Sequence, residues 1–385
     1  MPCVRKRNTS GEMCTPKKVA WGRGLLCWLL TLASIMSAQA AGPGDYWPFD
    51  QYYEKYPEQR AWLGEMRQAV VSDAVRLAPG IQERPVRIAQ VYPGLQASSY
   101  WLDSERALTG RLNDLGIEFE LKTRYTTPNT QLDEQIRQIH ELLAWQPDYL
   151  IYTLDSPRQR MLIERLIQNT DTRLILQNIT TPLKAWEQRQ PFMYVGFDHT
   201  EGAQLLARHL AQRFPEADFG ILLRSKGLVS QMRGTGFIQA LPPSHRLRSS
   251  YYSDSSREGG RDAALRMLRE NPELHYIYAC STDVALGALD ALEQLQRSDV
   301  VVNGWGGGPE EIEQLRAGRL PVVLLRISDE AGIAMAEAIR RDLLGLPVAK
   351  VYAGHFEVLD ERMAPAEIRR HEQRAHRYSG GVDAE

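Results

Sequence analysis

The stretch Tyr276–Gly308, with the sequence YIYACSTDVALGALDALEQLQRSDVVVNGWGGG, decides the fold class that the sequence predicts. Its first five residues, Tyr276–Cys280, form a short apolar run that is typical of a buried strand. Ser281–Asp283 follow directly, and each of these residues is a favourable helix N-cap. Apolar positions then recur at helical spacing up to Leu292, and Val300–Val302 is predicted as the next strand. Strand, helix and strand in this order predict parallel βαβ units.

Polar and aromatic side chains follow both strands of this stretch. Thr282 and Asp283 come after the first strand, and Trp305 lies in the segment Asn-Gly-Trp-Gly-Gly-Gly after the second. Ligands of open α/β sheets bind outside the carboxyl ends of the strands. We therefore expect Thr282, Asp283 and Trp305 to hold a small molecule. Two alternatives stay open, namely that Asp283 only caps its helix and that Trp305 only packs in the core.

The same alternation fills most of the remaining chain. Strands and helices alternate from Val86 to Val195, and the pattern restarts with a helix at Glu201–Phe214. The second series ends with an extended segment at Val351–Phe356 and a charged tail that is expected on the surface. We therefore predict an α/β fold with two successive halves, each a parallel sheet with helices on both faces. Residues 41–84 are aromatic and polar, and are expected to form an N-terminal extension that packs outside the first half.

Composition limits the classes of function. The chain has 385 residues, a formal net charge of -2 at pH 7 and 43% hydrophobic residues. This length is enough for two domains with sizeable cores. The near-neutral charge argues against a nucleic-acid-binding surface, which would need a basic face.

The first 40 residues are predicted to be a signal peptide. Basic residues precede the apolar run Gly24–Met36, which is too short to span a bilayer comfortably. Ala38-Gln39-Ala40 is a small-x-small cleavage site, so the mature chain is expected to start at Ala41, with Met13 as an alternative start codon. The protein is therefore expected to be exported. Of its cysteines, only Cys280 lies after the cleavage site, so no internal disulfide is expected.

Further candidate ligand-binding residues follow other strands. Gln96, Ser98 and Trp101 come after the first strand, and an amide, a hydroxyl and an indole together suit a polyhydroxylated ring. The alternative is a turn with a buried tryptophan. Asn178 ends the fourth strand and offers another group that can both donate and accept.

Two arginines complete the candidate set. Arg233 lies near the start of a helix in the second half, and Arg326 ends the apolar strand VVLLR. An arginine at the end of a buried strand is costly unless it is paired, so Arg326 needs a carboxylate or an anionic ligand. The alternatives are that Arg326 forms a structural ion pair and that Arg233 lies on a helix surface.

Enzymatic and metal-binding motifs are absent from the sequence. The eight histidines are scattered without HExxH or a Cys/His cluster, and Ser281 lacks a G-x-S-x-G turn. The loop Gly304–Gly308 lacks the Lys-Ser/Thr pair of a phosphate-binding loop. We therefore predict that the protein is not an enzyme and needs neither a metal nor a cofactor.

Seven longer segments resemble one family. The segments VYPGLQASSYW, DYLIYTLD, LILQNITTP, YVGFDHTEG, YIYACSTDVALGA, NGWGGG and GIAMAEAI are similar to the ribose-binding-like periplasmic binding proteins, and within them to autoinducer-2 receptors of the LuxP type. The resemblance covers about residues 46–378. It implies a type I periplasmic binding protein with two lobes, three crossover strands and a ligand in the cleft between the lobes.

The resemblance also implies a division of the chain and a partner. The signal peptide would be 1–40, the extension 41–84, the first lobe 85–197 with 327–350, and the second lobe 198–326 with 351–385. The implied ligand is the cyclic borate diester of the quorum-sensing signal autoinducer-2, so the ligand would contain boron. The implied partner is the periplasmic domain of a LuxQ-type sensor histidine kinase, and the implied location is the periplasm.

The resemblance also implies a set of ligand residues, and one alternative function stays open. By motif, the ligand residues are Gln96, Ser98, Trp101, Asn178, Arg233, Thr282, Asp283, Trp305 and Arg326. The alternative function is a substrate-binding protein that delivers a pentose-like sugar to an ABC transporter. A dehydrogenase would need G-x-G-x-x-G after the first strand, where this chain has P-G-L-Q-A.

Overall fold

The computed structural model describes residues 43–380, apart from 94–97, 128–130 and 155. It begins with a 3-10 turn, η1 (Pro43–Asp45), and two helices, α1 (Phe49–Lys55) and α2 (Glu58–Val71). Tyr52 of α1 and Met66 of α2 are buried in apolar clusters with residues of the first sheet. Within the described part, no helix combines the length and the apolarity that crossing a bilayer requires.

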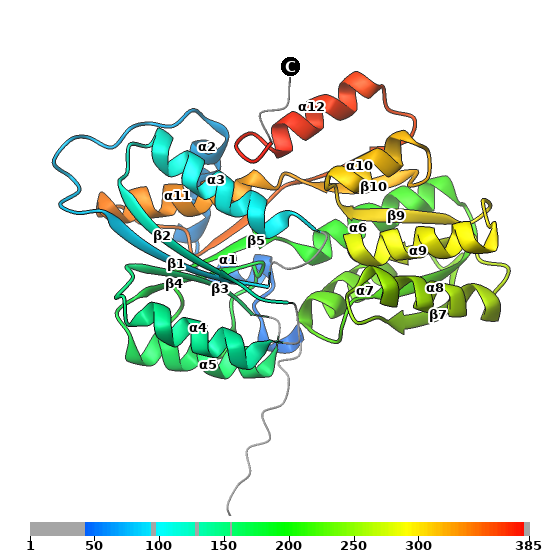
Figure 1. Cartoon of the computed structure of the whole chain (residues 1–385), viewed down its shortest axis with the longest axis horizontal. Helices are drawn as coiled ribbons and strands as arrows, with labels where there is room; N and C mark the ends of the chain where they lie inside the picture. The colour runs from blue at the N-terminus through cyan, green and yellow to red at the C-terminus, as the bar shows by residue number, and fades with distance from the viewer. Residues whose placement is uncertain (1–42, 94–97, 128–130, 155, 381–385) are drawn as a thin grey trace, which may run out of the picture. The chain divides into compact units, whose positions relative to one another are not determined.

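The first sheet has strand order β11-β5-β4-β3-β1-β2, and its strands are parallel (Figure 1). Every position of β3 and β5 is buried because helices cover both faces of the sheet, whereas the edge strand β2 has no fully buried residue. The strands of this sheet are β1 (Val86–Tyr92), β2 (Phe119–Tyr125), β3 (Tyr149–Thr153), β4 (Arg173–Gln177), β5 (Met193–Phe197) and β11 (Val351–Gly354).

The second sheet has strand order β12-β10-β9-β8-β6-β7. Its strands are parallel except β12, which runs antiparallel to β10. The strands of this sheet are β6 (Ala217–Leu223), β7 (His245–Tyr252), β8 (Tyr276–Ala279), β9 (Val301–Gly306), β10 (Val322–Arg326) and β12 (Phe356–Asp360).

Helices cover both faces of each sheet. Figure 1 shows α4 and α5 on one face of the first sheet and α3 and α11 on the other. In the second half, α8 to α10 pack against one apolar core and α6 and α7 against another. The bounds are α3 (Tyr100–Asp114), α4 (Leu132–Leu143), α5 (Pro157–Asn169), η2 (Lys184–Trp186), α6 (His199–Arg213), α7 (Leu228–Ala240), α8 (Arg257–Glu270), α9 (Thr282–Leu295), α10 (Pro309–Arg316), α11 (Asp329–Leu343) and α12 (Pro365–Ala375).

The chain crosses between the sheets three times. It passes from β5 to α6, from β10 to α11, and from β11 to β12. The fold class predicted from the sequence is therefore confirmed. One part of the predicted division is wrong, because residues 351–354 were assigned to the second lobe, yet β11 pairs with β5 in the first sheet. The extended segment predicted at Val351–Phe356 is two strands in different sheets, separated by His355 alone.

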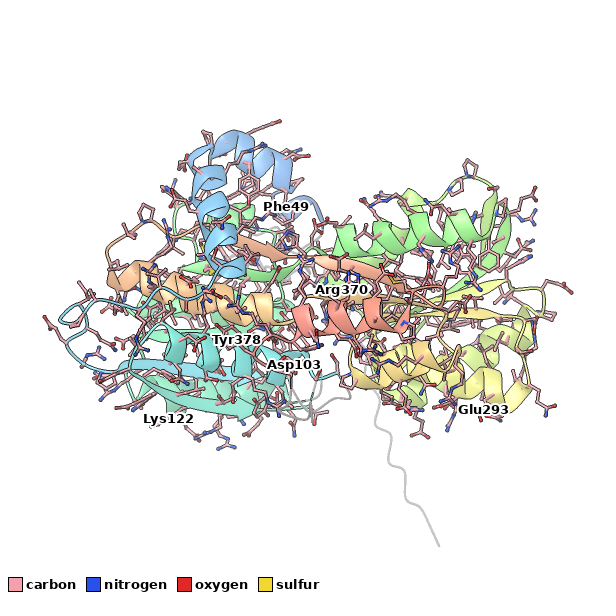
Figure 2. The ribbon with its side chains drawn as sticks, turned by 90° about the horizontal axis from the view of Figure 1, so that it is seen from above. Phe49, Asp103, Lys122, Glu293, Arg370 and Tyr378 are labelled. Atoms are coloured by element: carbon pink, nitrogen blue, oxygen red, sulfur yellow. The ribbon has the colours of Figure 1, made fainter. Side chains whose placement is uncertain are left out.

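The C-terminal segment contacts both halves of the molecule. Ile368 of α12 is buried in the core of the second sheet. Beyond the helix, the backbone N–H groups of Tyr378 and Ser379 donate to the carboxylate of Asp329 at the start of α11. Figure 2 labels Arg370 on α12 and Tyr378 beyond its end. The predicted surface tail is thus anchored at Tyr378 to the first half.

Candidate functional site: a cavity between the two sheets

The strand ends of both sheets meet at a cavity of about 460 Å³. Eight of the nine predicted ligand residues line it, and Gln96 lies outside the described residues. The cavity therefore brings together side chains that are far apart in the sequence. The eight are Ser98, Trp101, Asn178, Arg233, Thr282, Asp283, Trp305 and Arg326.

The wall from the first sheet combines rings with amides. The ring of Trp101 lies 4.9 Å from that of Tyr92, measured between centroids, so the indole is held by the core beneath it. The amides of Gln135 and Gln159 also line the cavity, and the Gln135 amide is fixed by Tyr152, whose hydroxyl donates to its Oε1 at 2.8 Å. Neither glutamine was predicted, because both lie on helices where their spacing indicates only amphipathic faces.

Asn178 takes its place in the cavity through an uncommon backbone conformation. Its φ is +69°, in the left-handed region, where asparagine is one of the few side chains tolerated. Its N–H donates to the carbonyl of Val195 at 2.8 Å, so the chain turns immediately after β4. The turn brings Asn178 to the carboxyl end of the sheet, as the sequence predicts.

The loop after β9 is held by a buried carboxylate. Glu311, in the first turn of α10, accepts from the N–H of Trp305 at 2.6 Å and from the N–H of Gly307 at 2.7 Å. Thr282 Oγ1 donates to the carbonyl of Trp305 at 2.9 Å, and this bond joins the carboxyl ends of β8 and β9. Burial raises the pKa of Glu311, while these N–H donors act in the opposite direction.

The glycines of this loop are explained by close packing. Gly306 has a φ of +132°, and a Cβ there would lie 2.8 Å from Arg326 Nη2 and 3.1 Å from Thr282 Oγ1. A side chain at this position would displace the guanidinium. The glycine at position 306 is therefore required by the approach of the loop to Arg326.

Arg233 is buried at the cavity with neutral partners. Its Nη1 donates to the carbonyl of Cys280, and its Nε and Nη2 lie 3.4 and 3.3 Å from His199 Nδ1. Its guanidinium carbon lies 4.3 Å from the centre of the Trp305 ring, close enough for a cation–π contact. Burial lowers the pKa of Arg233 to about 9, so the guanidinium is charged at neutral pH.

Arg326 is the second buried arginine of the cavity. Its Nη2 donates to Ser98 Oγ at 3.2 Å, and its guanidinium carbon lies 4.5 Å from the centre of the Tyr100 ring. Among the residues that the structure describes, no carboxylate forms an ion pair with Arg326 or Arg233. Burial lowers the pKa of Arg326 as well. Both cations are thus left for a group inside the cavity.

Several buried donors of the cavity-lining residues lack a partner in the described part of the chain. They belong to four residues, the indole N–H of Trp305, the Nε–H of Arg326 and the hydroxyls of Tyr100 and Ser281. Buried donors in folded proteins are nearly always paired, so these groups indicate a ligand rich in oxygen acceptors. No grouping of three or more His, Cys, Asp or Glu side chains able to hold a metal occurs among the described residues.

Comparison with known proteins identifies the family. The model of the family described as "Periplasmic binding protein domain" matches residues 88–345. The chain belongs to this family. Its members are periplasmic proteins that bind solutes and are not enzymes, and the family typically needs no cofactor.

The relatives are similar to this chain over part of their length. The ribose import binding protein RbsB of Salmonella typhimurium is 26% identical over 163 residues, which is 41% of this chain and 55% of the relative. The chain therefore spans about half the length of that curated relative.

Two solved structures share the fold. An ABC transporter solute-binding protein from Actinobacillus succinogenes with bound D-allose superposes with a TM-score of 0.65 at 20% identity, over 74% of this chain and 100% of the other. The fructose-binding periplasmic domain of a hybrid two-component system has a TM-score of 0.65 at 17% identity, over 75% of this chain and 95% of the other. These likenesses support the type I periplasmic binding protein fold.

Proposed function

We propose that this protein is a periplasmic receptor that binds one small, sugar-like molecule in the cavity between its two sheets. The observation that supports this most is the lining of the cavity, where the indoles of Trp101 and Trp305 lie among hydroxyl, amide and guanidinium groups from both halves. Aromatic rings suit the apolar face of a sugar ring, and the polar groups suit its hydroxyls. The ribose-binding and allose-binding relatives support the same class of ligand.

The proposed ligand residues are the nine predicted from the sequence. The first half would contribute Gln96, Ser98, Trp101 and Asn178, and the second half with the crossover would contribute Arg233, Thr282, Asp283, Trp305 and Arg326. A ligand that touches both halves stabilises the conformation in which they lie together. Small-angle scattering is expected to show a smaller radius of gyration with ligand than without it.

A second candidate ligand is the borate diester of autoinducer-2, as bound by LuxP. One observation favours it over a neutral pentose, namely the two buried arginines that have no carboxylate partner among the described residues. A tetrahedral borate diester is sugar-like in shape and has one negative charge. Hydrogen bonds to a charged group contribute about 1.5–3 kcal/mol each, which corresponds to roughly tenfold to a hundredfold in affinity.

The partner follows from which ligand is bound. A receptor for a neutral sugar would deliver it to an ABC transporter, whereas an autoinducer-2 receptor would regulate a LuxQ-type sensor histidine kinase. The similarity in fold to the periplasmic domain of a two-component system supports the kinase as a partner of this architecture. Either role requires export, for which the proposed signal peptide with cleavage after Ala40 provides the route.

Titration calorimetry tests the proposal directly. The mature protein, from which any co-purified ligand has been removed, would be titrated with D-ribose, D-allose, and autoinducer-2 with and without boric acid. Binding of a sugar alone would favour transport, and borate-dependent binding of autoinducer-2 would favour the signal receptor. Failure to bind any of them, together with unchanged melting temperatures, would overturn the proposal.

A further inference from the structure

His199 joins two ligand residues from opposite halves without lining the cavity itself. It is the first residue of α6, is 2% exposed, and follows the first crossing of the chain. Its Nε2 lies 3.0 Å from the carbonyl oxygen of Asn178, and its Nδ1 lies 3.3 Å from Nη2 of Arg233. Asn178 belongs to the first half and Arg233 to the second. His199 therefore sets the positions of both from behind the cavity wall.

The hydrogen-bond partners fix the protonation of the imidazole. A guanidinium only donates, so Nδ1 of His199 must be the acceptor for Arg233. The proton then lies on Nε2, which donates to the carbonyl of Asn178. Burial and the neighbouring cations Arg233, Arg326 and Arg224 lower the pKa of His199 well below its usual value. His199 is thus neutral at physiological pH.

This arrangement leaves the charge of Arg233 uncompensated. Its two protein acceptors, the carbonyl of Cys280 and the imidazole of His199, are both neutral. They take three of its five N–H groups, so one hydrogen each on Nη1 and Nη2 remains for a ligand. A carboxylate in place of the imidazole would accept from the same guanidinium and would neutralise it.

We propose that His199 is a positioning residue that determines the charge of the ligand. By offering Arg233 a neutral acceptor, it keeps a cation available for a negatively charged, polyhydroxylated ligand, and by bonding Asn178 it holds that cation in register with the first half. This inference rests on the proposed function, because the ligand is assumed to occupy the cavity.

The test compares two substitutions of His199. Glutamine preserves the pattern, since its carbonyl can accept from Arg233 and its amide can donate to Asn178, while remaining neutral. Glutamate also accepts from Arg233 but adds a charge. The probes are D-ribose, which is neutral, and autoinducer-2 with boric acid, which forms the anionic diester. The measured quantity is the ratio of the two dissociation constants for wild type, His199→Gln and His199→Glu.

The expected results differ between the variants. His199→Gln should keep the wild-type preference for the charged probe within about threefold, whereas His199→Glu should lower that preference by at least about tenfold, because a charge-assisted hydrogen bond is weakened. An unchanged ratio in His199→Glu would overturn the inference. A loss of preference in His199→Gln as large as that in His199→Glu would also overturn it. The charge of the side chain at position 199 would then make no difference to the preference for the charged probe.

Two further measurements keep the test decisive. If wild type binds neither probe, the proposed function fails. The inference is then tested with sulfate, compared with chloride at equal ionic strength. Sulfate should raise the melting temperature of wild type and His199→Gln more than that of His199→Glu. Equal shifts would overturn it. If His199→Glu gives no cooperative melting transition, His199→Leu replaces it. Loss of charge preference in His199→Leu with retention in His199→Gln supports the inference, and wild-type behaviour of His199→Leu overturns it.

Discussion

Arg111 and Arg233 are both buried arginines, but only one of them has a counter-charge. Arg111, in α3, is 0% exposed, and its Nε donates to Glu337 of α11 at 2.8 Å. Its remaining donors reach the carbonyls of Ala69 and Ser72 and the hydroxyl of Tyr378. Arg233 is 3% exposed and meets only neutral acceptors in the described part of the chain.

The difference separates a structural cation from one that is available to a ligand. The surroundings of Arg111 satisfy both its charge and its hydrogen bonds, so nothing is left for another molecule. Arg233 and Arg326 line a cavity, and their positive charges have no carboxylate partner among the described residues. A buried charge without a partner lowers the stability of the fold unless a ligand compensates it. Burial alone therefore does not make an arginine a candidate binding residue, whereas burial beside a cavity without a carboxylate partner does.

The largest expected effect tests the structural side of this comparison. Arg111→Met leaves the buried carboxylate of Glu337 with only the longer ion pair to Arg340 at 4.0 Å, and should lower the free energy of unfolding by about 3–5 kcal/mol. Denaturant unfolding of the ligand-free protein measures it. The double variant Arg111→Met with Glu337→Met removes both charges and should recover most of the loss. A single variant as stable as wild type would contradict the structural role.

The next effect tests the cavity side. Arg326→Met and Arg233→Met keep much of the side-chain volume but remove the charge, so affinity for an anionic ligand should fall roughly tenfold to a hundredfold. Melting of the empty protein should stay unchanged or rise, because an uncompensated buried charge is removed. Calorimetry and melting curves of the same samples distinguish the two effects. Lost stability with retained charge selectivity would make these arginines structural, like Arg111.

A smaller effect is expected at Ser98. Its hydroxyl accepts from Nη2 of Arg326 at 3.2 Å, so Ser98→Ala removes one contact but leaves both cations in place. Affinity should fall by roughly threefold to tenfold, from the loss of about 0.5–1.5 kcal/mol. Titration calorimetry of Ser98→Ala beside Arg326→Met gives the comparison. Equal losses in the two variants would show that the hydroxyl, rather than the charge, determines binding at this point.

The smallest expected effect concerns the ion pair of His355 and Glu330, in which one partner is half-exposed and the other is buried. The carboxylate of Glu330, at the start of α11, lies 2.9 Å from Nδ1 of the half-exposed His355, between β11 and β12, and raises the pKa of that imidazole. Burial of the imidazole, and after it Arg67 and Arg374, lower this pKa, but the effect of Glu330 is larger. Because the folded pKa lies above the unfolded value of about 6.5, the pair stabilises the fold at lower pH and loses that contribution as the pH rises through the folded pKa.

The measurement is unfolding free energy against pH for wild type and His355→Asn. The advantage of wild type should be largest below about pH 6.5 and should shrink toward alkaline pH. A difference between the two proteins that grows with rising pH would contradict the sign of this coupling.

The sequence predicts most of the fold because apolar residues follow different patterns in its strands and in its helices. Apolar runs such as Tyr276–Cys280 and amphipathic helices between them indicate βαβ units without reference to tertiary structure. The exit of β11 into one sheet and of β12 into the other was not predictable in this way. His355 alone separates them, and Gly354, which ends β11 just before it, does not show that the next strand joins the other sheet. Which sheet a strand joins depends on pairing with β5 or β10, which is distant in sequence.

The residues of the candidate site that lie at strand ends were predictable from the sequence, whereas those on helices were not. Thr282, Trp305 and Arg326 follow or end strands, so the general rule for α/β sheets finds them. Gln159 and His199 lie near helix starts, and nothing in their spacing shows that they meet residues of other elements. The Phe197-Asp-His199 segment indicates only a helix beginning after Asp198, whose carboxylate accepts from Thr200 N–H at 2.9 Å.

The position of β11 in the first sheet has a consequence for the order of synthesis. The edge of that sheet is completed by residues 351–354, and the buried ion pair Arg111–Glu337 joins positions 226 residues apart. At about 5–20 residues per second, roughly 8–30 s separate the translation of Phe197 from that of Gly354. During this interval the nascent first half lacks its last strand and α11. The polypeptide therefore stays without its complete native structure until nearly all of it has left the ribosome, the condition in which a chain can still be threaded through a translocation channel.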